Sequence, residues 1–310
     1  MSVRQNTNGR AYEYACINAI KEAISYAIID ENEAYKTSKK AFNSLSADEK
    51  QTYKISANAM VPYLLQAEPK IMQDNELFLQ IQADAQGIAG DVRDILLQKP
   101  NIAWIIGLSV KHNHFALKHS RLSQTLDFGA SWYGVSVGDE YKSQIAPIFA
   151  LLQSHKGKPW QDVNIDKNAS TYRPLLQAFM SEVLRANSID KKLPQKIVEY
   201  LLGRYDFYKV ISVENQRLTQ LQGFNLYGSL NQKGKIKPKI IVPKAKMPSR
   251  LIHLDFKPNS HNTLELILDE GWQFSLRIHN ASSKIENSLK FDVKLISYPA
   301  SIIKIDCIWG

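Results

Sequence analysis

Hydrophobic residues recur along the N-terminal part of the chain at the spacing of helix faces. One such face is formed by Ile17, Ile20, Ile24 and Ile28. This periodicity predicts an amphipathic helix that buries one side. A second helix is expected over about 47–60, where Pro62 would end or kink it. We therefore expect residues 1 to about 90 to be mainly helical.

Two short apolar runs follow, over 92–97 and 103–110, and each has the length of a β-strand. The intervening residues, Gln-Lys-Pro-Asn at 98–101, are typical of a turn, so the two strands are expected to be neighbours. Residues 140–204 again have a helical pattern. Pro194 suits a first helical turn there, and Gly203 suits a helix end.

Strand patterns dominate from residue 207 onward, and turn residues separate them. The expected strands cover 207–213, 251–256, 263–268, 272–279, 289–296 and 302–308. The pattern therefore predicts a mixed α/β (α+β) protein. Residues 1–210 would form a helical and α/β region and residues 211–310 a β-rich region, with one integrated domain as the alternative.

Composition adds a preference for polyanions. The chain has 310 residues, of which 44% are hydrophobic, enough for a sizeable core. It carries 39 Lys and Arg against 30 Asp and Glu, a net charge of +9 that is compatible with binding nucleic acid. No apolar run is long enough to span a membrane. Because Cys16 and Cys307 are the only cysteines, no disulfide framework is expected, which favours a reducing cytoplasm.

The positive charge is concentrated in two stretches that contain no acidic residue. The first lies between Asp94 and Asp127, and the second covers 231–250. In the second, lysines occupy every other position at Lys233, Lys235, Lys237 and Lys239. Such spacing places side chains on one side of an extended strand, although Pro238 restricts it to an edge strand or a loop. These lysines would contact phosphates or, alternatively, keep a solvated edge from aggregating.

The two neighbouring strand patterns bring together residues that suit phosphodiester hydrolysis. Asp94 directly precedes the first apolar run, and Ser109 and Lys111 lie on one face of the second strand together with Gly107. A carboxylate can anchor a divalent ion, while a lysine can orient the attacking water and stabilise charge on the phosphate. This is the spacing of the PD-(D/E)XK nuclease core, in a variant with serine at the position of the second acid. The alternative is that Asp94 caps a strand and Lys111 lies at a solvated strand end.

With serine at position 109, another carboxylate must complete a metal site. Glu13 is the first candidate, because it lies on the same helical stripe as Ile17. A carboxylate beside a core-facing stripe is costly unless it is paired or bound to metal. It could instead reach water or pair with Arg10. Asp91 is the second candidate, although strand alternation would place it opposite Asp94 unless the chain bends at Gly90.

A basic polar segment follows the second strand. Its candidate contacts to the DNA backbone are Asn113, Lys118, His119 and Arg121. Their position beside the proposed cleavage centre motivates this role, and an ordinary polar loop is the alternative. Zinc is not expected, because the histidines of this segment do not complete a tetrahedral ligand set.

At this point the chain resembles a known family, the HaeIII family of type II restriction endonucleases. The resemblance is carried by Gly-Asp-Val-Arg-Asp at 90–94 and by the segment GLSVKHNHFA at 107–116. It continues at 8–14, 118–123, 126–129, 175–180, 198–203, 206–212, 271–275, 277–282 and 288–293. It covers nearly the whole chain, and segments such as 154–170 and 231–250 are less similar.

The resemblance implies Mg²⁺-dependent cleavage of double-stranded DNA at GGCC in a bacterial restriction–modification system, with a cytosine methyltransferase as the companion enzyme. Asp94, the carbonyl of Val110 and either Glu13 or Asp91 would hold the ion, and Lys111 would assist the attacking water. A palindromic target favours a homodimer, and a monomer stays open. The alternatives are a nuclease of different specificity, a non-catalytic DNA-binding protein and a basic scaffold protein.

The C-terminal strands supply candidates for reading bases. In the strand pattern 272–279, apolar residues alternate with polar ones, and the next expected strand alternates in the same way. The candidate DNA contacts on the polar faces are Gln273, Arg277, His279, Asn280, Lys290 and Asp292. Arginine can bond guanine and a carboxylate can accept from cytosine. An ordinary half-exposed sheet with ion pairs is the alternative.

Overall fold

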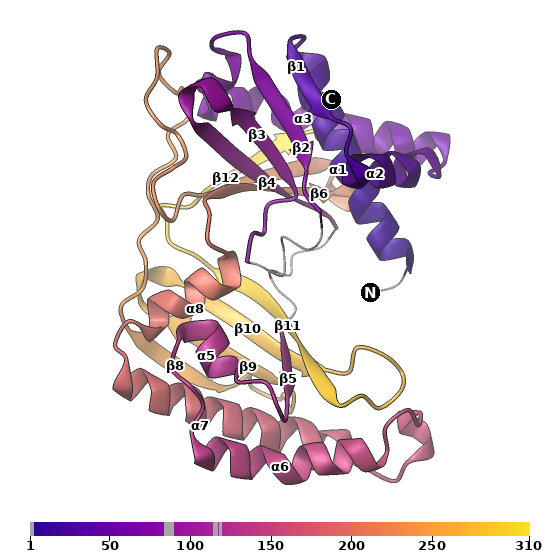
Figure 1. The fold of residues 1–310 in the computed structure, drawn as a ribbon, viewed down its shortest axis with the longest axis vertical. Helices are drawn as coiled ribbons and strands as arrows, with labels where there is room; N and C mark the ends of the chain where they lie inside the picture. Colours follow the sequence, from indigo (N-terminus) through magenta and orange to yellow (C-terminus); the bar gives the residue numbers. More distant parts are fainter. Residues whose placement is uncertain (1–2, 84–89, 114–116, 118–119) are drawn as a thin grey trace. The chain divides into compact units, whose positions relative to one another are not determined.

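The chain folds into two compact units, each assembled from segments far apart in the sequence. The computed structural model describes residues 3–83, 90–113, 117 and 120–310 (Figure 1). Unit 1 comprises residues 1–115, 203–246 and 300–310, and unit 2 comprises residues 116–202 and 247–299. This division differs from the consecutive regions 1–210 and 211–310 expected from the sequence, because the chain leaves unit 1 and returns to it twice.

Unit 1 is built on a mixed sheet, here called sheet A. In the described residues it has seven strands in the order β1-β2-β3-β4-β6-β7-β12. Their bounds are β1 Ala27–Asp30, β2 Leu77–Ile81, β3 Ile95–Lys99, β4 Trp104–His112, β6 Phe207–Val213, β7 Leu218–Phe224 and β12 Ile303–Ile308. The pairs β1/β2 and β4/β6 are parallel, and the other neighbours are antiparallel.

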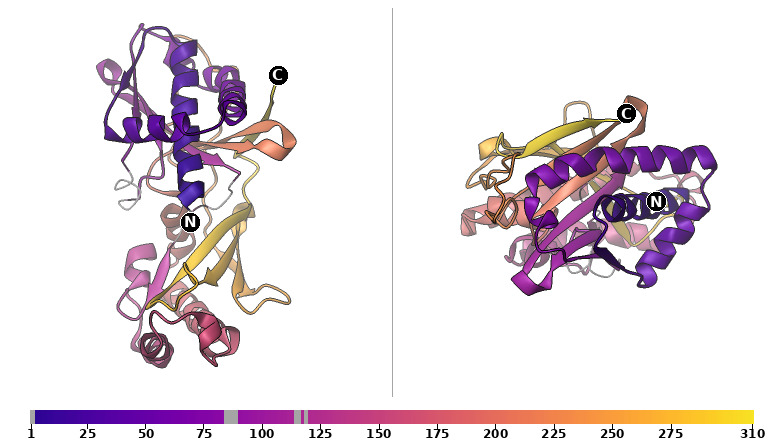
Figure 2. Two further views of the ribbon diagram at one scale, coloured as in Figure 1. Left: turned by 90° about the vertical axis from the view of Figure 1, so that its right-hand side faces the viewer. Right: turned by 90° about the horizontal axis from the view of Figure 1, so that it is seen from above.

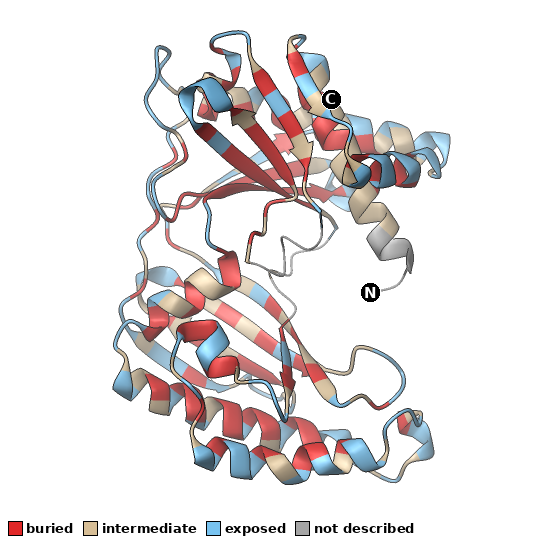
Figure 3. Ribbon diagram, in the orientation of Figure 1, coloured by how far each residue is buried: buried red, intermediate tan, exposed pale blue. Residues whose placement is uncertain are grey.

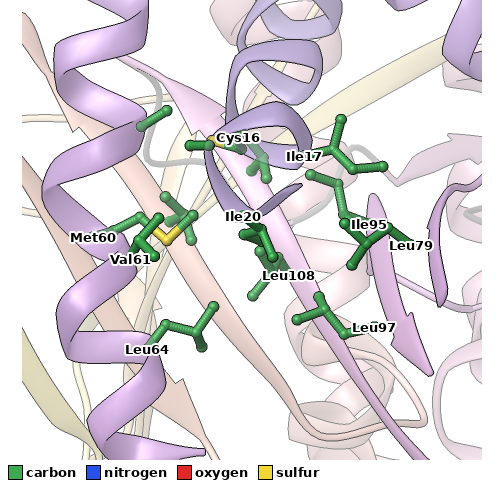
Figure 4. Packing of buried hydrophobic residues seen from close by; sticks show 14 of the residues in the cluster. Cys16, Ile17, Ile20, Met60, Val61, Leu64, Leu79, Ile95, Leu97 and Leu108 are labelled. Carbon is green, nitrogen blue, oxygen red and sulfur yellow. The ribbon is translucent and has the colours of Figure 1, made fainter. Parts of the chain in front are cut away.

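Among the described residues, unit 1 also contains the helices α1 Val3–Ala23, α2 Glu33–Asn43 and α3 Ala47–Ala67. Side chains of α1 and α3 form the core together with inward-facing residues of sheet A, such as Ile20, Leu64 and Leu108 (Figure 4). The two helices run in clearly different directions, as the two views of Figure 2 show. Because α1 packs on sheet A through this core, the sheet fixes the position of the helix that carries Glu13.

Unit 2 is built on a second, antiparallel sheet, sheet B, in the order β5-β11-β10-β9-β8. Its strands are β5 Arg121–Ser123, β8 Leu251–Phe256, β9 Thr263–Leu268, β10 Gln273–His279 and β11 Ser288–Ser297, and its helices are α5 Phe128–Tyr133, α6 Asp139–Ser154, α7 Arg173–Ile189 and α8 Leu193–Leu202. Alternate residues of β10 and β11 are buried (Figure 3). Phe291 on β11 meets Phe179 of α7 at a ring distance of 5.2 Å, so helices cover the apolar face.

Short helical turns connect these elements. They cover Pro69–Met72, Pro100–Ile102, Trp160–Asp162, Asn168–Tyr172, Glu214–Gln216 and Asp269–Gly271. No helix in the described parts of the chain is long and apolar enough to cross a lipid bilayer.

The expected mixed α/β class is confirmed, whereas three local expectations are wrong. The N-terminal helix ends at Ala23, so Ile28 lies in the short strand β1 and is exposed rather than on the helical stripe. Helix α3 continues past Pro62, and its next turn buries Leu64 in the core, which offsets the hydrogen bond that proline cannot donate. Strands β1, β2, β5 and β7 were not expected.

Candidate active site

The carboxylate of Asp94 is the centre of the proposed site. Strands β3 and β4 are antiparallel, and their register pairs Ile95 with Leu108. Residues 109–112 of β4 therefore extend beyond the start of β3, where Asp94 lies. Its Oδ2 accepts hydrogen bonds from the backbone N–H of Val110 at 2.6 Å and from Lys111 Nζ at 2.8 Å, and Ser109 Oγ lies 3.5 Å away. The acid and the lysine thus converge as the strand pattern predicts.

The ion pair between Asp94 and Lys111 is partly shielded from water. Their side chains are 25% and 28% exposed, respectively. Burial alone would lower the pKa of Lys111, but the charge and the hydrogen bond of Asp94 raise it above its ordinary value. Lys111 therefore presents a protonated ammonium group beside the carboxylate.

Glu13 is a candidate second acid, because it lies within electrostatic range of Asp94. It lies on α1 on the same side as Ile17 and Ile20, which are fully buried. Ser38 of α2 donates a hydrogen bond of 3.3 Å to Glu13 Oε2. Burial and, after it, the negative charge of Asp94 raise the pKa of Glu13 to about 8. A carboxyl group whose pKa is raised by a neighbouring carboxylate is typical of two acids that share one site.

Asp91 occupies a different environment. Its carboxylate forms a bidentate ion pair with Arg93, with distances of 2.8 Å to Nε and 2.7 Å to Nη2. Gln82 Nε2 donates a further hydrogen bond of 3.0 Å. Burial acts to raise the pKa of Asp91, but these hydrogen bonds lower it below its ordinary value. Of the two candidates for a second metal-binding acid, the structure brings Glu13 within electrostatic range of Asp94 and engages Asp91 with Arg93.

The donor set at Asp94 suits a hard divalent cation. Both hydrogen bonds shorter than 3 Å that reach its carboxylate go to Oδ2, which leaves Oδ1 as the candidate metal ligand. The N–H of Val110 points towards Asp94, and in an extended strand the carbonyl of the same residue points to the same side. Carboxylate and carbonyl oxygens are the ligands that Mg²⁺ prefers. Within the described ranges no group of three acids, histidines or cysteines could hold a metal, so a bound ion would keep water ligands.

Comparison with known proteins identifies the family of the chain. The model of the HaeIII restriction endonuclease family matches residues 9–299. The chain is 46% identical to the type II restriction enzyme HaeIII of Haemophilus aegyptius over 317 aligned positions, which cover 100% of this chain and 99% of that enzyme. The chain belongs to the HaeIII restriction endonuclease family. No solved structure matches it.

For a member of the HaeIII family, Asn113 is of interest because it directly follows β4, two positions after Lys111. Asn113 has a positive φ of 50° and accepts a hydrogen bond of 3.0 Å from the backbone N–H of Glu214. Its side-chain Nδ2 also donates to Glu214 Oε2 at 3.2 Å. Asn113 thus fixes the turn after β6, and both residues line a cavity of about 540 Å³. Lys118 and His119 lie outside the described residues.

The lysine segment 233–239 is not a strand. It lies in the long connection between β7 and β8, in keeping with the loop that Pro238 allows. Lys233, Lys235 and Lys237 are exposed, and Lys235 forms an ion pair of 2.8 Å with Asp74. The backbone N–H of Lys239 donates to the carbonyl of Gln66 at 2.9 Å, so the segment is attached to the end of α3.

The polar face of sheet B brings most of the remaining candidates together. In register across β10, β11 and β5, His279 pairs with Lys290, which pairs with Arg121. In the next row, Arg277 Nη2 lies 3.3 Å from Asp292 Oδ2.

The other members of this face have local partners. Gln273 is half-buried at the start of β10. His279 Nδ1 lies 2.6 Å from the carbonyl of Asn280, whose side chain donates to the carbonyl of Lys284 at 3.2 Å. Arg121 donates to Glu286 at 3.0 Å. The face therefore carries basic and acidic side chains with ion pairs between them.

Two residues near the centre were missed in the sequence. Lys209 of β6 is in register with Ser109 and is 4% exposed. Burial and, after it, the charge of Lys111 lower the pKa of Lys209 to about 7. The signal for it was a lysine within an otherwise apolar strand. Arg93 lacked such a signal, because its partner Asp91 lies only two positions away and was interpreted as a metal ligand.

Proposed function

We propose that this chain hydrolyses phosphodiester bonds in both strands of DNA at a short palindrome, with Mg²⁺ as the cofactor. The observation that carries the proposal is the convergence of Asp94 and Lys111, whose Oδ2 and Nζ atoms are 2.8 Å apart. GGCC is the first candidate target, because the resemblance to the HaeIII family implies it and the 46% identity to the HaeIII enzyme supports it.

The residues of the centre have distinct roles in this proposal. Asp94, Glu13 and the carbonyl of Val110 would hold the ion. Mg²⁺ bound there would polarise the scissile phosphate and make a bound water more acidic. Lys111 orients the attacking water and stabilises the negative charge that develops on the phosphate. The water oxygen attacks phosphorus and releases a proton to solvent, the bond to the 3′ oxygen breaks, and that oxygen takes up a proton from solvent. The products therefore carry 5′-phosphate and 3′-hydroxyl ends.

The basic surfaces would hold the duplex. The exposed lysines at 233, 235 and 237 and the loop at Asn113 are candidates for phosphate contacts. On sheet B, Arg277 and Asp292 have the donor and acceptor chemistry that a G·C pair requires. In this proposal unit 1 cleaves the DNA and unit 2 recognises the base sequence. Each of these roles belongs to segments that are not consecutive in the sequence.

The biological setting follows from this function. A restriction enzyme requires a companion methyltransferase that protects the host DNA, here a cytosine methyltransferase. We place the chain in the bacterial cytoplasm, and the buried thiols of Cys16 and Cys307 fit reducing conditions. A palindromic target favours two active sites related by two-fold symmetry, and a homodimer supplies them. A monomer would have to cut the two strands one after the other.

Digestion of a sequenced plasmid tests the proposal directly. The protein is incubated with the plasmid in the presence of Mg²⁺ or of EDTA, and the fragment ends are mapped by sequencing. Discrete fragments that form only with Mg²⁺ and end within GGCC are expected. Absence of discrete Mg²⁺-dependent fragments would refute the nuclease, whereas fragments that end elsewhere would refute only the target sequence.

A further inference from the structure

The segment that leads into Asp94 is held by an unusually dense set of polar contacts. Arg93 and Asp91 are each only 8% exposed and form the bidentate ion pair described above. The backbone N–H of Arg93 also donates to Asp91 Oδ1 at 3.1 Å. Gln82 Nε2 donates both to Asp91 Oδ2 at 3.0 Å and to the carbonyl of Arg93 at 2.9 Å. Three side chains, Gln82, Asp91 and Arg93, thus form a connected network of hydrogen bonds.

The backbone of Asp94 is held on one side by Gln82 of this network and on the other side by β4. The N–H of Gln82 donates to the carbonyl of Asp94 at 2.9 Å, and the N–H of Asp94 donates to the carbonyl of Leu108 at 2.7 Å. Both peptide groups of Asp94 are therefore engaged. Its carboxylate has little freedom other than rotation of its own side chain.

The side chain of Arg93 is also fixed by packing. Its aliphatic part lies against Gly107, where a Cβ atom would collide with it. Its guanidinium carbon lies 4.0 Å from the centre of the Tyr205 ring. The planar guanidinium group of arginine donates two parallel hydrogen bonds to one carboxylate and so fixes their relative orientation. Two apolar side chains of similar volume in place of Arg93 and Asp91 could not do this. A buried ion pair adds little net stability over such an apolar pair, so its benefit is fixed geometry.

We propose that Gln82, Asp91 and Arg93 form a clamp that holds Asp94 where it binds the divalent ion, and that Arg93 is a positioning residue of the catalytic centre. The inference rests on the proposed function, because it takes Asp94 as the metal-binding acid. It assigns Asp91 to the clamp, not to the ion. Residues that orient a metal ligand typically change metal affinity 10- to 100-fold when they are replaced.

Calorimetric titration with Ca²⁺ tests the clamp on the full-length protein without DNA. The variants are Arg93→Met, Asp91→Asn and the double variant. The clamp predicts that each single variant weakens Ca²⁺ binding by about tenfold and that the double variant is no weaker than either single one. If Asp91 were an ion ligand, Asp91→Asn would weaken binding far more than Arg93→Met, and that result would overturn the proposal.

The matched control is Arg185→Met in unit 2. Arg185 also forms a bidentate pair, with Glu182 at 2.6 Å and 2.9 Å. The variant Arg185→Met should leave Ca²⁺ binding unchanged. Arg93→Lys keeps the charge without the fork and should also weaken binding, which preserves the test if Arg93→Met does not fold. Unchanged binding in Asp94→Asn would refute the proposed metal site. Loss in Asp94→Asn with no loss in either Arg93 variant would refute the clamp alone.

Discussion

The ion pair between Asp94 and Lys111 offers a quantitative test, because it is expected to act on both stability and catalysis. Asp94→Asn keeps the size of the side chain but leaves the ammonium group of Lys111 without its counter-charge. Breaking a fully buried pair costs roughly 3–5 kcal/mol, and an exposed pair contributes roughly 0–1 kcal/mol. Since these side chains are 25% and 28% exposed, we expect Asp94→Asn to lower the free energy of unfolding by about 2 kcal/mol.

A double-mutant cycle separates this interaction from other effects of the substitutions. Asp94→Asn, Lys111→Met and the double variant are unfolded in urea without metal, and we expect a coupling energy of about 1–2 kcal/mol. All three variants should cut plasmid DNA at least about 10³-fold more slowly than wild type, since each removes charge from the transition state.

The control cycle uses Asp139 and Lys142, a pair of similar length at 2.9 Å whose side chains are 98% and 58% exposed. It should give almost no coupling and unchanged cleavage. A coupling below about 0.5 kcal/mol at the Asp94 pair would refute the energetic reasoning. An Asp94→Asn protein that cuts within tenfold of the wild-type rate would refute the assignment of the centre.

Three further predictions concern packing, pH dependence and recognition. Gly107→Ala should lower the free energy of unfolding by about 1–3 kcal/mol, because the added methyl group collides with Arg93. The control Gly9→Ala places its methyl group in open space and should not lower the free energy of unfolding. Equal stabilities of the two variants in urea would contradict this prediction. Burial raises the pKa of Glu68 from 4.5 to about 7, so the folded protein must lose a proton when the pH rises between these values. The free energy of unfolding of the wild type should therefore fall by about 3 kcal/mol relative to Glu68→Gln over this range. Parallel stability profiles of the two proteins in urea at pH 5–8 would refute this prediction. Arg277→Ala should weaken binding to GGCC duplexes more than to unrelated duplexes in fluorescence anisotropy, and an equal loss on both would make it a phosphate contact.

Three strands of this protein could be predicted from the sequence with their full bounds, because turn residues flank their apolar runs. The expected strands 207–213, 251–256 and 263–268 match β6, β8 and β9 in full. The helix that starts beside Pro194 and ends before Gly203 is confirmed, and Gly203 has a φ of 97° that glycine adopts without strain. Strand β1 was missed because it has only four residues and one buried side chain.

The division into units could not be predicted from local patterns. The register of β12 against β7 brings residues 303–308 back to unit 1, although they follow a long series of strands that belong to sheet B. A local pattern reports which face of a strand is buried, but it does not report which sheet receives the strand. Long-range pairing therefore decides where the chain crosses between units.

The candidate site shows the same distinction between chemistry and placement. Period two was sufficient to place Ser109 and Lys111 on one face, because the alternate residues of β4 are apolar and buried. The sequence could not decide between Glu13 and Asp91, since that choice depends on the packing of α1 on sheet A. It also did not pair Asp91 with Arg93, although residues two apart on an extended strand share a face, because Asp91 was interpreted as a metal ligand.

The serine at position 109 is consistent with its surroundings. Lys209 stands in register beside it on the neighbouring strand, and parallel strands are about 4.8 Å apart. An acid at position 109 would therefore form an ion pair with this buried lysine and would be drawn away from Asp94. Glu13 approaches Asp94 from α1 instead, and burial together with the charge of Asp94 raises its pKa to about 8. Holding two carboxylates together in this way is unfavourable without a cation, and a divalent ion bound between them would offset that cost.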